Sequence, residues 1–317
     1  MDDGTMSVRL FADRDLPAVL ELLKDSLGET ASLRRTPELF GWKHFDNPFG
    51  RSLMLVSHIG PTITGFRAFM RWELNTPDGR TLRCVRAVDT ATHADFRRRG
   101  IFKTLTLAAI DAATDDGVDL IFNTPNPRSG AGYLKMGWSE VGLLRPIASP
   151  AKGILRRGGD PDALPVPSDF IEPATAVGPR ITPDRDPLGL RTPRSTDYHA
   201  WRFTSHPTAR YVQVDRAGAT AIARLAFRGS RRELLVSDVY GDGMRQAINR
   251  CRRVAKTSYV GAFFSKGTPE RAAATRAGLI QVPRAGLTLM VRPLRELGID
   301  VKRLSTWDLS LSDLELL

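Results

Sequence analysis

"HADFRRRGIFKTL", residues 93–105, places three consecutive arginines and a glycine directly before an apolar pattern with helical spacing. The apolar residues after the glycine share one helical face: Ile101, Leu105, Ala108, Ala109 and Ala112. The first N–H groups of a helix have no partner within it, and the helix dipole adds positive charge there. A glycine lets a diphosphate approach these donors closely, and arginines can clamp further phosphate oxygens. The segment therefore predicts an anion-binding turn, with a plain surface turn as the alternative.

The segments around this turn alternate between strand and helix character. A helix is expected over 16–27, with Asp13 or Asp15 as its cap, Pro17 in its first turn and Gly28 at its end. A second short helix is expected around 130–135. Strands are expected over 52–60, 64–74, 83–92, 118–124 and 138–144. Strand–helix–strand within about 40 residues indicates a parallel crossover, so the predicted fold is α/β with a mixed sheet flanked by helices.

The second half of the chain repeats the first weakly. "WKHFDNP" at 42–48 matches "WRFTSHP" at 201–207, and each precedes a pair of expected strands. The pattern predicts two such halves in tandem, with chance resemblance as the alternative. Residues 146–194 hold ten of the 21 prolines, which indicates a connector. The predicted domains are 1–150, a proline-rich connector 151–194, and 195–317.

Composition narrows the function. A length of 317 residues is typical of two domains, and the net charge of +11 favours anionic partners, although solvated surface charge explains it equally well. The candidates are a phosphorylated cofactor, a nucleotide-linked substrate or an acidic membrane face; nucleic acid is disfavoured because no basic segment alternates with aromatic residues. Two distant cysteines and five scattered histidines indicate no disulfide framework and no metal site. Without an apolar span or signal peptide, a cytoplasmic location is expected.

The turn and a second segment carry a resemblance to a known family. Arg97 and Gly100 match an Arg/Gln-x-x-Gly-x-Gly/Ala loop, except that Phe102 stands where Gly or Ala is usual. "NPRSGAGYLKMGW", residues 126–138, matches an Asn-x-x-Ala/Ser element followed by Tyr-x-x-x-Gly-aromatic. In these two elements the sequence resembles the GNAT superfamily of acyl-CoA-dependent N-acyltransferases. The resemblance implies a sheet that is splayed at its centre.

The resemblance also implies acyl-CoA, with acetyl-CoA foremost, as co-substrate. The thioester carbonyl is expected to meet a backbone N–H near residues 88–91. Asn126 is expected to tether the splayed backbone or the cofactor, with a role as turn-former the alternative. The residues expected to bind the cofactor are Val88, Thr90, Arg97, Arg98, Arg99, Gly100, Ile101, Phe102, Lys103, Asn126 and Ser129.

Two residues are the first candidates for catalysis, one as the acid and one as the base. By the same resemblance Tyr133 gives a proton to the departing thiolate, for which a phenol is a suitable acid; packing against the sheet is its structural alternative. Asp89 is the first candidate for the base, because a carboxylate in the apolar stretch 85–93 is costly to bury unless it is paired or functional. Pairing with Arg86 is the structural alternative for Asp89. Glu73 and His93 are the other candidate bases.

The second half lacks these features. Counting back from the glycine of each copy places Ala274 opposite Tyr133 and Gly267 opposite Asn126, and no Arg-x-x-Gly turn opens a helix there. We expect a degenerate copy that shapes the acceptor cleft. Trp42 and Trp201 are expected to anchor the core. The acidic, apolar C-terminal segment 307–317 is expected either to dock on the basic body or to fray.

The resulting functional hypothesis is transfer of an acetyl or short acyl group from acyl-CoA to a primary amine, by direct attack in a ternary complex. A phosphorylated or nucleotide-linked amino sugar is one candidate acceptor, because it suits the positive charge. Two alternatives come from other classes. One is an aminoacyl transferase that uses aminoacyl-tRNA, and the other is a CoA-binding module without turnover.

Overall fold

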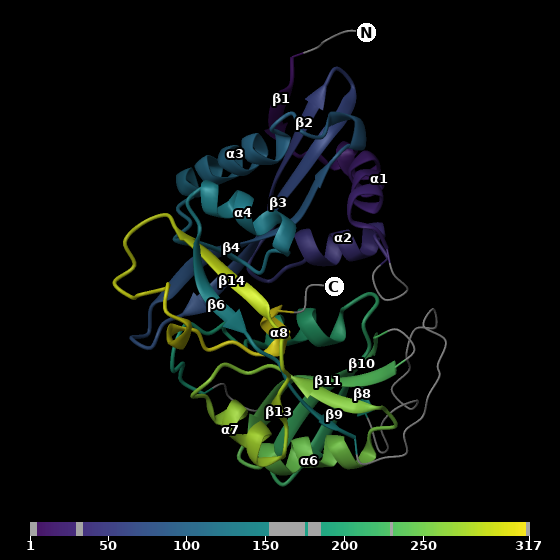
Figure 1. Ribbon diagram of the computed structural model, residues 1–317, viewed down its shortest axis with the longest axis vertical. Helices are drawn as coiled ribbons and strands as arrows, with labels where there is room; N and C mark the ends of the chain where they lie inside the picture. The colour runs from purple at the N-terminus through teal and green to yellow at the C-terminus, as the bar shows by residue number, and fades with distance from the viewer. Residues whose placement is uncertain (1–4, 30–33, 152–174, 177–184, 229–230, 315–317) are drawn as a thin grey trace.

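The chain folds around two seven-stranded mixed sheets, one above the other in Figure 1. The computed structural model describes residues 5–29, 34–151, 175–176, 185–228 and 231–314. In the first sheet the strand order is β1 (Ser7–Leu10), β2 (Leu53–Ile59), β3 (Thr62–Asn75), β4 (Thr81–Thr92), β5 (Leu120–Asn123), β14 (Leu287–Pro293) and β6 (Ser139–Leu144). In the second the order is β13 (Ile280–Gln281), β7 (Ile147–Pro150), β12 (Tyr259–Ala262), β11 (Arg231–Gly241), β10 (Ala219–Arg228), β9 (Tyr211–Arg216) and β8 (Thr175–Ala176). The predicted α/β class is confirmed.

Helices cover both faces of the first sheet (Figure 1). Apolar side chains of α1 (Leu16–Leu27) and α2 (Pro37–His44) pack on one face, and those of α3 (Ile101–Asp115) and α4 (Pro127–Lys135) on the other. Helix α4 starts three residues earlier than expected, because Asn126 caps it and proline suits the first helical position. The remaining helical elements are α6 (Met244–Val254), α7 (Pro269–Arg276), the short turns α5 (Thr196–His199) and α8 (Leu311–Leu314), and η1 (Asp13–Asp15), η2 (Ala94–Phe96), η4 (Ala200–Thr204) and η5 (Leu304–Thr306). No helix in the described ranges is both long and apolar enough to span a membrane.

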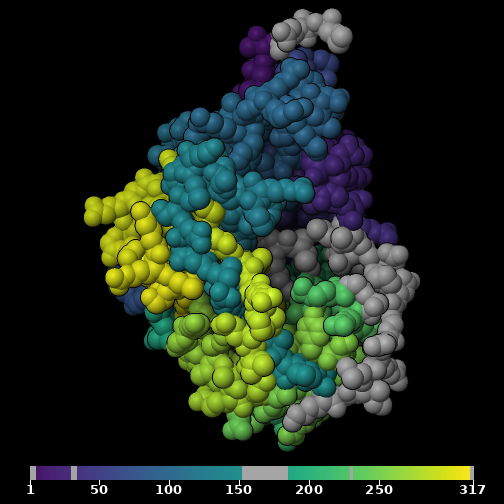
Figure 2. Space-filling view, viewed as in Figure 1, coloured from purple at the N-terminus to yellow at the C-terminus, as the bar shows by residue number. Residues whose placement is uncertain are grey.

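The two halves exchange strands. The C-terminal strand β14 lies between β5 and β6 of the first sheet and pairs antiparallel with both. In the other direction, β7 leaves the first half and pairs with β12 and β13 of the second sheet. Figure 2 shows teal atoms among the green ones of the second half. The sheets therefore cross the predicted boundaries at 150 and 195, and each sheet is completed by a strand from the other half.

Two tryptophans join the halves at their common core. The rings of Trp42 and Trp201 stack with centroids 4.7 Å apart and an interplanar angle of 10°. Each indole Nε1 donates to the backbone oxygen of the other residue over 2.8 Å. Both side chains are buried, so the prediction that they anchor the core is confirmed.

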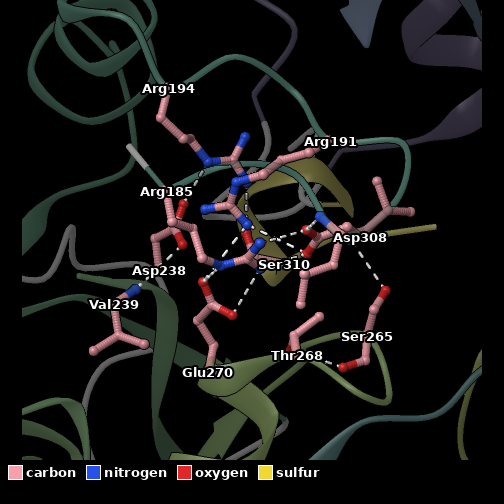
Figure 3. Close-up of polar contacts among 12 residues, drawn as sticks. Arg185, Arg191, Arg194, Asp238, Val239, Ser265, Thr268, Glu270, Asp308 and Ser310 are labelled. Atoms are coloured by element: carbon pink, nitrogen blue, oxygen red, sulfur yellow. Dashed lines mark hydrogen bonds and ion pairs between the residues drawn. The ribbon is translucent and has the colours of Figure 1, made fainter. Parts of the chain in front are cut away.

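Buried ion pairs fasten the end of the connector and the C-terminal segment (Figure 3). Arg185 and Arg191 bind Asp308, at 2.7 and 3.3 Å, and Arg194 binds Asp238 and Asp313, each at 2.8 Å. The acidic C-terminal segment is therefore docked on basic side chains through residue 313, as one of its two expected arrangements required. The connector positions 152–174 and 177–184, and the last residues 315–317, lie outside the described residues.

The two sheets share an irregularity that supports a duplication. The register of β3 and β4 shifts so that Asp89 has no opposite residue, and β10 and β11 shift in the same way at Ser237. Beside the bulge, Arg67 pairs with Thr90 in the first sheet and Ile222 pairs with Asp238 in the second. Ile222 is therefore the residue of the second half that is equivalent to Arg67.

The helices that follow align as well. Trp138 N donates to Tyr133 O, and Leu279 N donates in the same way to Ala274 O. This confirms Ala274 as the counterpart of Tyr133. The helix caps give a one-residue correction: Asn126 corresponds to Thr268, not to Gly267, because α4 has one more residue than α7.

Candidate active site

A cleft of about 470 Å³ opens at the centre of the first sheet. Strands β4 and β5 pair in parallel only from Cys84 to Arg86, opposite Leu120 to Phe122, and diverge beyond. This is the splay that the sequence resemblance implies. The predicted site residues that line the cleft are Val88, Asp89, Thr90, Phe102, Asn126, Ser129 and Tyr133.

The basic turn before α3 presents unpaired donors. The backbone N–H groups of residues 98–103 have no hydrogen-bond partner in the part of the chain that the structure describes. Arg98 and Gly100 have φ angles of 65° and 79°, a left-handed turn that leaves open space where a Cβ of Gly100 would stand. Ile101 turns its side chain into the core, so only its main chain is available to a ligand.

The charged side chains of the turn form no ion pairs within the described residues. Arg97, Arg98, Arg99 and Lys103 are exposed, and no carboxylate of the described ranges pairs with them. Arg99 lies over the ring of Phe96, with its guanidinium carbon 5.2 Å from the centroid. Free main-chain donors surrounded by unpaired cations fit a diphosphate.

Tyr133 lies at the inner wall of the cleft, and its side chain is 4 % exposed. Its ring packs between Trp138 and Phe102, with centroid distances of 4.9 and 5.5 Å. Its hydroxyl oxygen accepts a hydrogen bond of 2.8 Å from Nη1 of Arg67, a buried residue of β3. Arg67 is the first site residue that the sequence analysis missed, although a single charge in the apolar stretch 65–70 was a signal.

Phe102, the departure from the family loop, has a structural partner. A Cβ placed on Gly132 would lie 2.9 Å from Cε1 of Phe102, so the aromatic ring occupies the space beside that glycine. The ring meets Tyr133 edge-on at 86°. Phe102 thus fixes the phenol while its own N–H remains at the helix start.

Asp89, the first candidate base, is held in a buried ion cluster. Its carboxylate lies 2.7 Å from Nζ of Lys43 and 3.0 Å from Nε2 of His44, with Arg35 at 3.6 Å. Burial alone would raise its pKa, but Lys43 and His44 outweigh this effect and hold the pKa of Asp89 far below its usual range. A carboxylate so stabilised in its ionised form is a weak base.

Burial lowers the pKa of His44 more than Asp89 raises it, which favours the neutral form of the imidazole. It bridges Asp89 and the hydroxyl of Ser52, which lies 2.9 Å from Nδ1. The sequence offered no signal for Lys43 and His44. Arg86, the partner considered from sequence, instead lies over the rings of Trp72 and Phe122 and binds the backbone oxygen of Asp313.

The other two candidate bases lie away from the phenol. Glu73 stands opposite Arg83 in the β3–β4 pair, six positions along the strand from Arg67 and so about 20 Å away. His93 caps the turn η2 by accepting from the N–H of Asp95 at 3.3 Å. Neither residue lines the cleft.

Two asparagines lie at and after the end of β5: Asn126 caps helix α4, and Asn123 has side-chain amide atoms without a partner among the described residues. Asn126 accepts from the N–H of Ser129 at 3.0 Å, so its role as a turn-former is present and its oxygen is occupied. Asn123 is 3 % exposed and lines the cleft, yet neither its oxygen nor its nitrogen has a partner within the described residues. The sequence analysis did not single out Asn123, which offers a ligand both a donor and an acceptor.

The corresponding region of the second half is closed. A Cβ on Gly243, at the start of α6, would overlap the backbone oxygen of Ala217. The β9–β10 turn therefore covers the helix terminus that is open in α3. Ile222 and Ala274 replace Arg67 and Tyr133, so the second half has neither the guanidinium nor the phenol at these positions.

Comparisons with known proteins agree with this geometry. Residues 7–141 match the family described as acetyltransferase (GNAT) domain. A GCN5-related N-acetyltransferase from Anabaena variabilis superposes with a TM-score of 0.62 at 9 % identity, over 92 % of this chain and 73 % of that one. A GCN5-related N-acetyltransferase from Kribbella flavida superposes with a TM-score of 0.58 at 14 % identity, over 92 % of this chain and 72 % of that one. Eis1 from Mycobacterium abscessus superposes with a TM-score of 0.56 at 14 % identity, over 92 % of this chain and 74 % of that one.

No curated protein sequence matches this chain significantly. At these identities the superpositions concern the fold, which extends over both halves. The splay of the sheet, the basic turn and Tyr133 all lie within the matched residues 7–141. Residues 7–141 are therefore identified as a GNAT acetyltransferase domain.

Proposed function

We propose that this protein transfers an acetyl group from acetyl-CoA to a primary amine of a small molecule. The observation that carries the proposal is the set of unpaired N–H groups at residues 98–103 beside a cleft that contains Tyr133. Those donors would hold the diphosphate, and Arg97, Arg98 and Arg99 would hold further phosphate oxygens. The thioester would then enter the cleft between β4 and β5.

The chemistry requires one bond to form as another breaks. The neutral amine nitrogen bonds to the acetyl carbon, the carbon–sulfur bond breaks, and the departing thiolate takes the phenol proton of Tyr133. A backbone N–H of residues 88–91, beyond the last β4–β5 pair, would polarise the carbonyl oxygen. The free amide of Asn123 suits the amide groups of the pantetheine arm.

The proton of the amine goes to water in our proposal. Asp89 is the single carboxylate lining the cleft within the described residues, and its ion pairs keep it from accepting a proton. Asp89 instead fixes the bulge of β4 and neutralises Lys43. We therefore expect the rate to rise with pH according to the pKa of the acceptor amine itself.

The second half shapes the acceptor side of the cleft in this proposal. Its closed helix terminus and its replaced tyrosine support a single active half. The net charge of +11 supports an anionic acceptor, for which a phosphorylated or nucleotide-linked amino sugar is our first candidate.

Binding and turnover test the proposal separately. Acetyl-CoA should bind with sub-millimolar affinity by calorimetry, and Gly100→Glu should abolish binding by placing a carboxylate at the phosphate position. Gly79→Glu is a matched control, because Gly79 has a φ of 82° and also faces open space, in the β3–β4 turn. Equal binding by the Gly100→Glu variant would contradict the site.

Turnover is measured as thiol release across a panel of amines that includes nucleotide amino sugars. Tyr133→Phe should lower kcat about 100-fold or more while acetyl-CoA still binds. Protection from thermal unfolding by transfer RNA but not by CoA would favour the aminoacyl-tRNA alternative. Binding of CoA with no thiol release for any amine would favour a module without turnover.

A further inference from the structure

A buried arginine beside the phenol has no acidic partner in the described part of the chain. Arg67 has no exposed surface, and no carboxylate of the described ranges forms an ion pair with it. Its Nη1 donates to the hydroxyl oxygens of Tyr133 and Thr90, while Nε and Nη2 have no partner among the residues that the structure describes. The guanidinium carbon lies 4.9 Å from the ring centre of Phe69 and 5.4 Å from that of Tyr133.

Such a placement is unfavourable for folding, because a charge buried without a counter-charge loses its hydration without compensation. An apolar residue would fill the same position at lower cost, and the second sheet shows one: Ile222 stands at the position of Arg67. In the same copy Ala274 replaces Tyr133. The arginine and the tyrosine are therefore present together in the open half and absent together in the closed half.

The chemistry of the contact determines what Arg67 does to the phenol. A guanidinium has donors only, so the oxygen of Tyr133 must be the acceptor in this hydrogen bond. The phenol proton must then point away from Arg67, toward another acceptor. Once that proton leaves, the nearby positive charge stabilises the phenolate that remains.

We propose that Arg67 is a positioning residue that orients the phenol of Tyr133 as a proton donor toward the cleft and stabilises its ionised form. The inference rests on the proposed function for its catalytic consequence, but the pairing itself can be measured without substrate. Thr90, which accepts from the same nitrogen, holds the guanidinium in place from β4.

The first test follows the phenol directly. The ultraviolet absorbance of the protein is titrated at alkaline pH, and subtracting the titration of a Tyr133→Phe variant leaves the change that depends on Tyr133. The midpoint of this change should lie about one pH unit or more higher in Arg67→Met than in the parent. Arg86→Met is the matched control: Arg86 is also a buried arginine among aromatic rings of this sheet but does not touch Tyr133. Equal midpoints in the parent and Arg67→Met would overturn the proposal.

The second test follows turnover. Arg67→Met should lower kcat about tenfold or more, leave the affinity for acetyl-CoA within about twofold, and move the alkaline limb of the pH–rate profile upward, whereas Arg67→Lys should recover part of the loss. In a Tyr133→Phe background, Arg67→Met should have no further effect. An equal loss in both backgrounds would show a structural role instead. If the parent does not bind acetyl-CoA at all, the proposed function fails, and the absorbance titration still decides the role of Arg67.

Discussion

The replacement Asp89→Asn separates the two roles that this carboxylate can have. Asn fits the same space and tolerates the left-handed φ of 36°, so the change removes charge and little else. At 2.7 Å from Lys43, an effective dielectric constant of 20 gives an attraction of about 6 kcal/mol before desolvation is subtracted. Since breaking a buried pair by removing one partner costs about 3–5 kcal/mol, we expect the free energy of unfolding to fall by about 3–4 kcal/mol at pH 7.

The difference in unfolding free energy between the parent and Asp89→Asn should also depend on pH, in a definite direction. The pKa of Asp89 is lowered in the folded protein, so its stabilisation is present above the unfolded pKa of about 4 and is lost as the pH falls below that value. The difference between parent and Asp89→Asn should therefore be constant from pH 5 to 7. Below about pH 4 it should shrink, by up to about 1.4 kcal/mol per pH unit.

Urea titration at pH 7, 5 and 3 measures these differences, with Asp13→Asn as control. Asp13 pairs with Arg51 at the surface, where its side chain is 75 % exposed, so its removal should have a much smaller effect. In folded Asp89→Asn protein, kcat should stay within about tenfold of the parent, because the residue does not accept the amine proton. Unchanged stability, or a fall in kcat of about 100-fold or more in fully folded protein, would refute this assignment.

Four further predictions follow from the architecture and the chemistry. Trp201→Ala should lower the free energy of unfolding by about 3–5 kcal/mol in urea, in one transition seen by probes in both halves; two separate transitions would contradict a shared core. Asp308→Asn should destabilise by about 3 kcal/mol, because it leaves Arg191 buried with less compensation; stability equal to the parent would contradict this. A chain ending at residue 150 should lack a cooperative thermal transition by circular dichroism, since β6 loses β14 and β7 loses its sheet. The acid limb of kcat/KM should shift between acceptors by the difference in their amine pKa values, and a limb common to all acceptors would indicate a protein base.

Local signals predicted much of the first half. The spacing of apolar residues, with glycine at its end, predicted the helix over 16–27 that α1 occupies. The glycine before Ile101 predicted the start of α3, and the tyrosine motif predicted a residue that lines the cleft. These features depend on neighbours in the chain, so sequence spacing carries them.

Features that depend on distant partners could not be predicted in this way. The pairing of β14 with β5 joins residues about 170 positions apart, and no pattern within either strand specifies the other. Asp89 illustrates the same limit within the site. Its burial was a sound inference, but its partners Lys43 and His44 lie on α2, about 45 positions earlier, and they convert a candidate base into a fixed anion.

The exchange of β7 and β14 has a consequence for synthesis on the ribosome. Strand β6 is complete at residue 144, whereas its neighbour β14 ends at residue 293. At about 5–20 residues per second, roughly 8–30 s separate the two, and during that time the edge of β6 has no partner. An unpaired edge invites association with other nascent chains, so slow translation of the second half should favour misassembly of the first.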